Sequence, residues 1–77
     1  MYTVVGKFKD SNMPKWKVKA ETKAAAYHET QHISRTLAGL SSIAVYTPEG
    51  DKHCYDGAGE YLFTILAKDC ASLGLKP

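Results

Sequence analysis

The stretch "YHETQH", residues 27–32, contains three side chains that could bind and use a metal ion. His28, Glu29 and His32 have the spacing H-E-x-x-H, which on a helix brings the two imidazoles to within about 5–6 Å of each other on one face. Two such imidazoles can ligate zinc, and the glutamate can act as general base on a zinc-bound water. A catalytic centre of this kind also needs a third protein ligand.

The stretch resembles the zincin motif over these five residues only. Metzincins continue with a glycine and a third histidine, but Arg35 and Ala38 stand at those two positions. At about 100° per residue, the apolar face of the helix centres on Ala26, Ile33 and Leu37, which places both histidines on the far side. We therefore interpret the motif as accidental and expect no enzyme, no bound metal and no cofactor. A minimal zinc-dependent hydrolase using the HETQH residues is the alternative.

The first twenty residues contain a second pattern, a set of lysines at alternating positions. Its members are Lys7, Lys9, Lys15, Lys17 and Lys19. On two paired strands they would share one side, opposite Trp16 and Val18. Edge strands often carry lysine to prevent aggregation, which would explain two or three of the five. The others indicate a basic hairpin face that binds an acidic partner.

The distribution of charge along the chain supports this interpretation. Residues 1–23 have a net charge of +4 and residues 24–77 a net charge of −2. Nucleic-acid readers usually add arginines or exposed aromatic platforms, but the chain has one arginine, and Phe8 and Trp16 alternate away from the lysines. The sequence thus predicts a non-catalytic binding module that docks on an acidic macromolecular partner, either a protein surface or nucleic-acid backbone, with a protein favoured. Accessory and inhibitor proteins of phages and mobile elements are often of this size. Homodimerisation is left open.

Composition places the chain among small globular proteins. Its 77 residues, 44% of them hydrophobic, make one domain at most. No run approaches the roughly 18 apolar residues that a membrane span requires, and the start of the chain does not resemble a secretory signal. Cys54 and Cys70 are too few for a disulfide framework, so we expect two reduced thiols in a cytoplasmic protein. A single bridge is the alternative if the chain is exported.

The elements that must position these residues follow from periodicity and turn residues. Alternation predicts a hairpin over residues 2–8 and 15–21, and strands over 42–47 and 52–55. Thr22 is a suitable N-cap for a first helix, closed by Gly39, and Asp56 with Gly57 could cap a second helix extending to about Leu73. The predicted fold is α+β, in the order ββαββα, with an antiparallel sheet of three to four strands and both helices on one face. The expected core residues are Phe8, Trp16, Val18, Ile33, Leu37, Leu62 and Leu66.

The two halves of the chain show a weak regularity. Residues 1–40 and residues 41–77 both read strand, strand, helix, Gly-Leu, which is the pattern of a duplicated ββα unit. Small α+β chains with a glycine at each helix end look similar without duplication. We therefore treat residues 1–77 as a single α+β domain.

Overall fold

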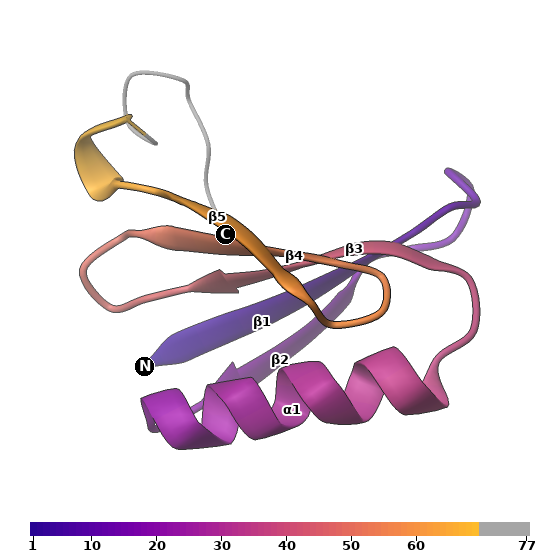
Figure 1. Cartoon of the computed structure of the whole chain (residues 1–77), viewed down its shortest axis with the longest axis horizontal. Helices are drawn as coiled ribbons and strands as arrows, with labels where there is room; N and C mark the ends of the chain where they lie inside the picture. Colours follow the sequence, from indigo (N-terminus) through magenta and orange to yellow (C-terminus); the bar gives the residue numbers. More distant parts are fainter. Residues whose placement is uncertain (70–77) are drawn as a thin grey trace.

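The computed structural model describes residues 1–69, which form a five-stranded antiparallel sheet with one main helix on one of its faces (Figure 1). The elements are β1 (Tyr2–Phe8), β2 (Trp16–Ala20), α1 (Lys23–Thr36), β3 (Leu40–Tyr46), β4 (Lys52–Asp56) and β5 (Tyr61–Ile65). The strand order in the sheet is β2-β1-β3-β4-β5. Residues 1–69 contain no helix that is long and apolar enough to cross a membrane.

The predicted hairpin is confirmed. β1 and β2 pair antiparallel, with Val4 opposite Val18 and Val5 opposite Lys17. β3 pairs antiparallel with the other edge of β1, so β2 and β3 run parallel with β1 between them. A parallel relationship requires a long crossover connection, and α1 provides it.

Hydrogen bonds cap both ends of helix α1. The Thr22 hydroxyl accepts a hydrogen bond of 3.1 Å from the backbone N–H of Ala25, which confirms the predicted N-cap. Leu37 is the C-cap, so the helix ends slightly before the predicted Gly39. Gly39 nevertheless has the left-handed conformation (φ 81°) that favours glycine, and it turns the chain into β3.

The core lies between α1 and the centre of the sheet. Its fully buried side chains include Val4 on β1, Ile43 on β3 and Ile33 on α1. Of the seven predicted core residues, Ile33 is buried in the core. Three others, Phe8, Val18 and Leu37, are partly buried and pack against the core. The prediction is wrong for the other three, Trp16, Leu62 and Leu66, whose exposed fractions are 42%, 53% and 49%.

The predicted second helix is the main error. Residues 61–65 form β5, which pairs with β4, and among the described residues after β5 only 67–69 are helical. The rest of that predicted helix, 70–73, lies outside the described residues. Asp56 was interpreted as a helix cap, but its Oδ1 accepts hydrogen bonds of 2.9 Å from the N–H groups of Ala58 and Glu60 in the turn between β4 and β5. The same capping chemistry therefore closes a hairpin, and the aromatic and β-branched sequence "YLFTI" continues the sheet.

Helix α1 covers only part of the sheet. It packs against β1, β2 and β3, whereas β4 and β5 extend beyond it on the same face (Figure 1). We call the side that carries α1 the helix face. Val4 and Gly6 point to this face, so Thr3, Val5 and Lys7 point to the opposite one.

Candidate functional site

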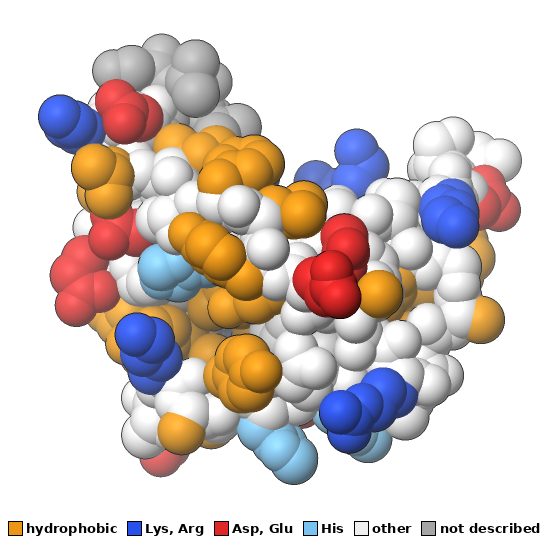
Figure 2. Space-filling view, in the orientation of Figure 1, with side chains coloured by type: hydrophobic (Ala, Val, Ile, Leu, Met, Phe, Trp, Pro, Cys, Tyr) orange, Lys and Arg blue, Asp and Glu red, His pale blue; other side chains and the backbone are white. Residues whose placement is uncertain are grey.

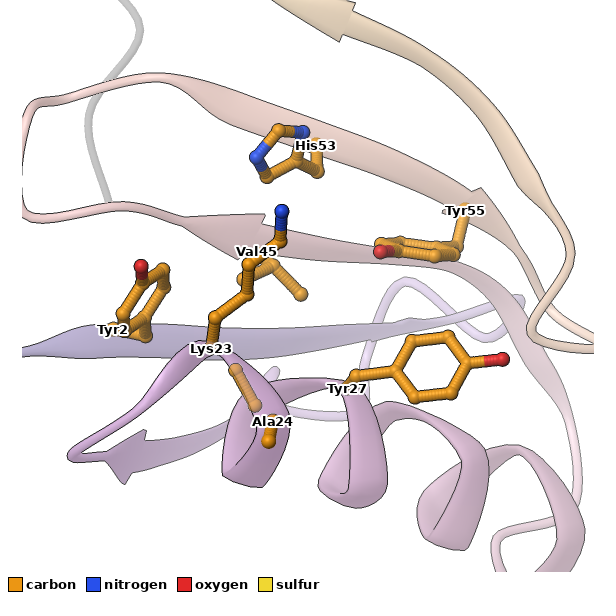
Figure 3. A pocket seen from close by; sticks show the side chains of 8 residues that line it. Tyr2, Lys23, Ala24, Tyr27, Val45, His53 and Tyr55 are labelled. Carbon is orange, nitrogen blue, oxygen red and sulfur yellow. The ribbon is translucent and has the colours of Figure 1, made fainter.

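A hollow of about 470 Å³ lies on the helix face, between the first turns of α1 and strand β4 (Figure 3). We call it the tyrosine pocket; its lining residues are Tyr2, Lys23, Ala24, Ala26, Tyr27, Val45, His53 and Tyr55. Ala26 and Val45 are buried and form an apolar floor. The hydroxyl of Tyr55 points toward the part of the pocket where Lys23 and Val45 lie, whereas the hydroxyl of Tyr27 points away from it.

The position of the pocket follows from how α1 is held. In its C-terminal half, the Gln31 side chain donates a hydrogen bond of 2.9 Å to the Gly59 carbonyl oxygen in the β4–β5 turn. The turn approaches so closely that a Cβ atom at residue 59 would lie 2.9 Å from the Ser34 hydroxyl oxygen. The N-terminal half of α1 presents the small side chains Ala24 and Ala26 instead. The space between helix and strand therefore opens at this end.

His53 is held in place by a hydrogen-bond chain between β4 and β5. Its Nδ1 lies 2.7 Å from the hydroxyl oxygen of Thr64, the residue opposite it in the sheet. The hydroxyl of Tyr61 lies 2.7 Å from the same Thr64 oxygen. These hydrogen bonds fix the imidazole ring through Nδ1, and Nε2 takes no part in them.

The charge in the pocket has one sign. Lys23 carries the formal charge among the described lining residues, and none of them is an aspartate or glutamate. Burial raises the pKa of Tyr55 above its ordinary value of 10.0, and the neighbouring Tyr27 and Tyr61 raise it further. Tyr55 is therefore a neutral phenol at neutral pH and can donate a hydrogen bond. Its ring also contacts that of Tyr61 edge to face, with 5.8 Å between centroids.

The opposite face of the sheet carries a row of residues that runs across four strands. The pairing registers place Lys19, Thr3, Tyr46 and Lys52 next to one another in that order. Lys19 Nζ donates a hydrogen bond of 3.1 Å to the Thr3 hydroxyl, and Lys52 Nζ lies 5.7 Å from the centroid of the Tyr46 ring. We call this surface the lysine face; its lysines are Lys7, Lys17, Lys19 and Lys52.

The five lysines predicted to form one surface do not all share it. Lys7, Lys17 and Lys19 project from the side opposite α1, as strand alternation predicts. The pairing of β1 with β3 is irregular between Lys7 and Phe8, which interrupts the alternation. Lys9 consequently lines a hollow on the helix face near Leu37, so its predicted position is wrong.

The other two corrections concern Lys15 and Lys52. Lys15 lies in the connection just before β2 rather than on the strand. Lys52 is not among the five lysines predicted from the sequence, although the register of the β3–β4 hairpin places it on this face. A tight turn at residues 48–51 places Lys52 directly opposite Tyr46, on the same side as Lys19.

The HETQH residues lie outside the tyrosine pocket, but His28 and Glu29 adjoin the lysine face at its β2 edge, where Lys19 lines the same hollow. His28 and His32 are exposed, as the helix phase predicts, and Glu29 is half-buried. His28 and Glu29 border a shallow hollow beside β2. Within residues 1–69, no three His, Cys, Asp or Glu side chains come together in a group that could hold a metal ion. The described residues therefore supply no third ligand to the histidine pair.

Apolar side chains also gather at the edge of the sheet that α1 does not cover. Tyr61, Leu62 and Phe63 on β5 are each more than half exposed. Figure 2 shows hydrophobic side chains concentrated between the helix and the upper strands, around the mouth of the pocket. Tyr61 contacts Tyr55 and extends the apolar surroundings of the pocket, whereas Phe63 lies opposite Cys54 and points to the other face of the sheet.

Comparisons of the chain with protein-family models, with curated proteins and with solved structures find no match. Function is therefore inferred from the two surfaces, the tyrosine pocket and the lysine face. They lie on opposite sides of one sheet, so a substitution on one of them leaves the side chains of the other in place.

Proposed function

We propose that the protein is a non-catalytic binding module that docks on an acidic macromolecular partner through the lysine face. The observation that carries the proposal is the position of Lys7 and Lys52. Both project from the same side as Lys17 and Lys19, yet they lie on β1 and β4, which are interior strands of the sheet. Protection of a sheet edge explains lysines on β2 alone, because interior strands have no unpaired edge to protect.

Several side chains that point to the lysine face are buried, although no helix covers them. Thr3, Val5 and Tyr46 are each less than 10% exposed although they point away from α1. The aliphatic stems of neighbouring lysines can cover such residues while their ammonium groups stay in water. Asp56, at the end of β4, uses its carboxylate to close the β4–β5 turn. The charges of Lys7, Lys17 and Lys52 are thus available to an incoming partner, whereas Lys19 lines a hollow together with Glu21 and Glu29.

An acidic protein surface suits the lysine face better than nucleic acid does. Proteins that bind single strands place exposed aromatic rings among their basic residues. Here Tyr46 is buried beside Lys52. Phe63 is exposed on the same face, but it lies on β5, at the far edge of the sheet from Lys17 and Lys19. Base readout commonly uses arginine, and the only arginine, Arg35, lies on α1. A module of 77 residues with this surface suits an accessory or inhibitor protein of a phage or mobile element.

The test is affinity capture from an extract of the cells that encode the protein, with and without nuclease. The variant Lys17→Glu/Lys19→Glu changes the lysine face, and Lys9→Glu/Arg35→Glu changes net charge equally on the other side of the molecule. We expect a nuclease-resistant protein to be captured by the parent and by the control variant, and to be lost with the lysine-face variant. Equal capture by all three proteins would overturn the proposal. Capture abolished by nuclease would assign the face to nucleic acid.

A further inference from the structure

We propose that the tyrosine pocket is a binding site for a small aromatic carboxylate. The inference is independent of the lysine face, since the pocket lies on the other side of the sheet. Its volume of about 470 Å³ falls within the range of roughly 300–1,000 Å³ that is typical of small-molecule sites. The ligand class follows from three properties of the lining: its apolar floor, its aromatic walls and its single sign of charge.

The floor and walls suit a flat ring. Val45 and Ala26, which are 4% and 1% exposed, form the bottom of the pocket, and their side chains contain no polar atoms. Tyr2, Tyr27 and Tyr55 surround this floor (Figure 3). Tyrosine rings stack on, or meet edge to face, another aromatic ring more favourably than they pack against a saturated one. Tyr27 is 56% exposed, so a ligand in the pocket would also remove part of its ring from water.

The polar atoms of the pocket select an anion. Lys23 extends from the start of α1 toward His53, so that its ammonium group and the imidazole lie on the same side of the pocket (Figure 3). The hydroxyl of Tyr55 points toward this region from the other side. An ammonium and a phenol can both donate to a carboxylate, and so can the imidazole when its Nε2 carries a proton. The described lining contains no carboxylate that would repel the ligand.

The donors are held in position before any ligand binds. The Thr64 hydroxyl fixes the His53 ring at 2.7 Å, and the edge-to-face contact with Tyr61 supports Tyr55. The hydrogen bond from Gln31 to Gly59 fixes the distance between α1 and the β4–β5 hairpin. Because these groups are already ordered, binding has a smaller entropic cost. Lys23 is the flexible donor and can close over the carboxylate.

Three probes separate the features of the ligand. Indole-3-carboxylate has both the ring and the charge, indole-3-carboxamide has the ring alone, and cyclohexanecarboxylate has the charge without the aromatic ring. Binding is measured by titration of the whole protein in two-dimensional NMR, with the methyl groups of Ala26 and Val45 as reporters of the pocket floor. We expect indole-3-carboxylate to bind about tenfold more tightly than either other probe, as one charge-assisted hydrogen bond and one aromatic contact imply.

Variants then assign the contributions to residues. Lys23→Gln should remove most of the preference for indole-3-carboxylate over the carboxamide, whereas Lys9→Gln, at the other end of α1, should leave it unchanged. Tyr27→Ala replaces an exposed side chain, so the fold should survive, and it should weaken both indole probes about equally. The proposal is overturned if the carboxamide or the saturated acid binds as tightly as indole-3-carboxylate. It is also overturned if the perturbed signals lie outside the pocket, or if Lys23→Gln and Lys9→Gln behave alike.

Discussion

The side-chain amide of Gln31 donates a hydrogen bond to the carbonyl oxygen of Gly59, across a distance of 2.9 Å. This bond joins the only main helix of the described residues to the β4–β5 turn, 28 residues later in the chain. Gln31 belongs to the C-terminal half of α1, whereas the tyrosine pocket lies against the N-terminal half. The geometry of the pocket therefore depends on a contact outside its lining.

Removing this bond should loosen the β4–β5 hairpin. We expect Gln31→Ala to lower the free energy of unfolding by about 1 kcal/mol, the usual net value of one hydrogen bond. The Gly59 amide donates to the Asp56 carbonyl oxygen at 3.0 Å, and its hydrogen exchange should become faster in the variant. His32→Ala, on the exposed side of the same helix, should stay within about 0.5 kcal/mol of the parent. Equal stability of the two variants would show that the Gln31 bond contributes nothing.

Tyr55 should make the protein sensitive to alkaline pH. Its pKa is raised in the folded state, chiefly by burial, while unfolding returns it to about 10.0. The neutral phenol therefore contributes stability that is fully present below the unfolded pKa and is lost as pH rises through the folded pKa. Tyrosinate absorbance should show an ionisation step above the ordinary pKa, and Tyr55→Phe should remove this late step. A parent protein that shows no ionisation step above the ordinary pKa would contradict the raised pKa of the partly buried Tyr55.

The core and the apolar edge of the sheet should differ in their response to truncation. Ile33 is 1% exposed, so Ile33→Ala should cost about 2–5 kcal/mol or leave the protein unfolded. Leu62 is 53% exposed, and Leu62→Ala should cost less than about 1 kcal/mol. Chemical denaturation of both variants checks the comparison. Similar losses would restore Leu62 to the core, where the helical interpretation of its sequence placed it.

The sequence predicts the first two thirds of the fold because its local signals agree there. Strict alternation around Trp16 and Val18 marks β2, and Thr22 caps a helix whose buried face has the expected spacing. In the last third the signals conflict. Leu62, Ile65 and Leu66 have helical spacing, but the same segment has strand-forming residues, and its pairing with β4 decides the outcome. Such a choice depends on tertiary contacts that local sequence does not contain.

The candidate sites are predictable to different degrees. Lys17 and Lys19 follow from alternation alone, whereas the irregularity after Lys7 moves Lys9 to the helix face without a clear sequence signal. The tyrosine pocket could not be predicted. His53 and Tyr55 were assigned to a short strand, but their meeting with Lys23 depends on the strand order and on α1 leaving β4 uncovered.

The HETQH residues should not bind zinc stoichiometrically. His28 and His32 are exposed, and the described residues offer no third ligand near them. Protein purified without an affinity tag should contain well under one zinc per chain by elemental analysis, and His28→Ala should not change that content. One zinc per chain, lost in His28→Ala, would return the hydrolase alternative to consideration.

The most direct test of the lysine face is the salt dependence of binding to an acidic peptide. Fluorescein-labelled deca-glutamate serves as the probe, and anisotropy is measured from about 0.01 to 0.15 M ionic strength, over which the screening length falls from roughly 30 to 8 Å. The parent and Lys9→Glu/Arg35→Glu should bind at low salt and weaken steeply as salt rises. Lys17→Glu/Lys19→Glu should bind about tenfold more weakly at low salt, with a flatter dependence, because repulsion replaces two attractions. If that variant binds as tightly as the parent at low salt, the lysine face is not the binding surface.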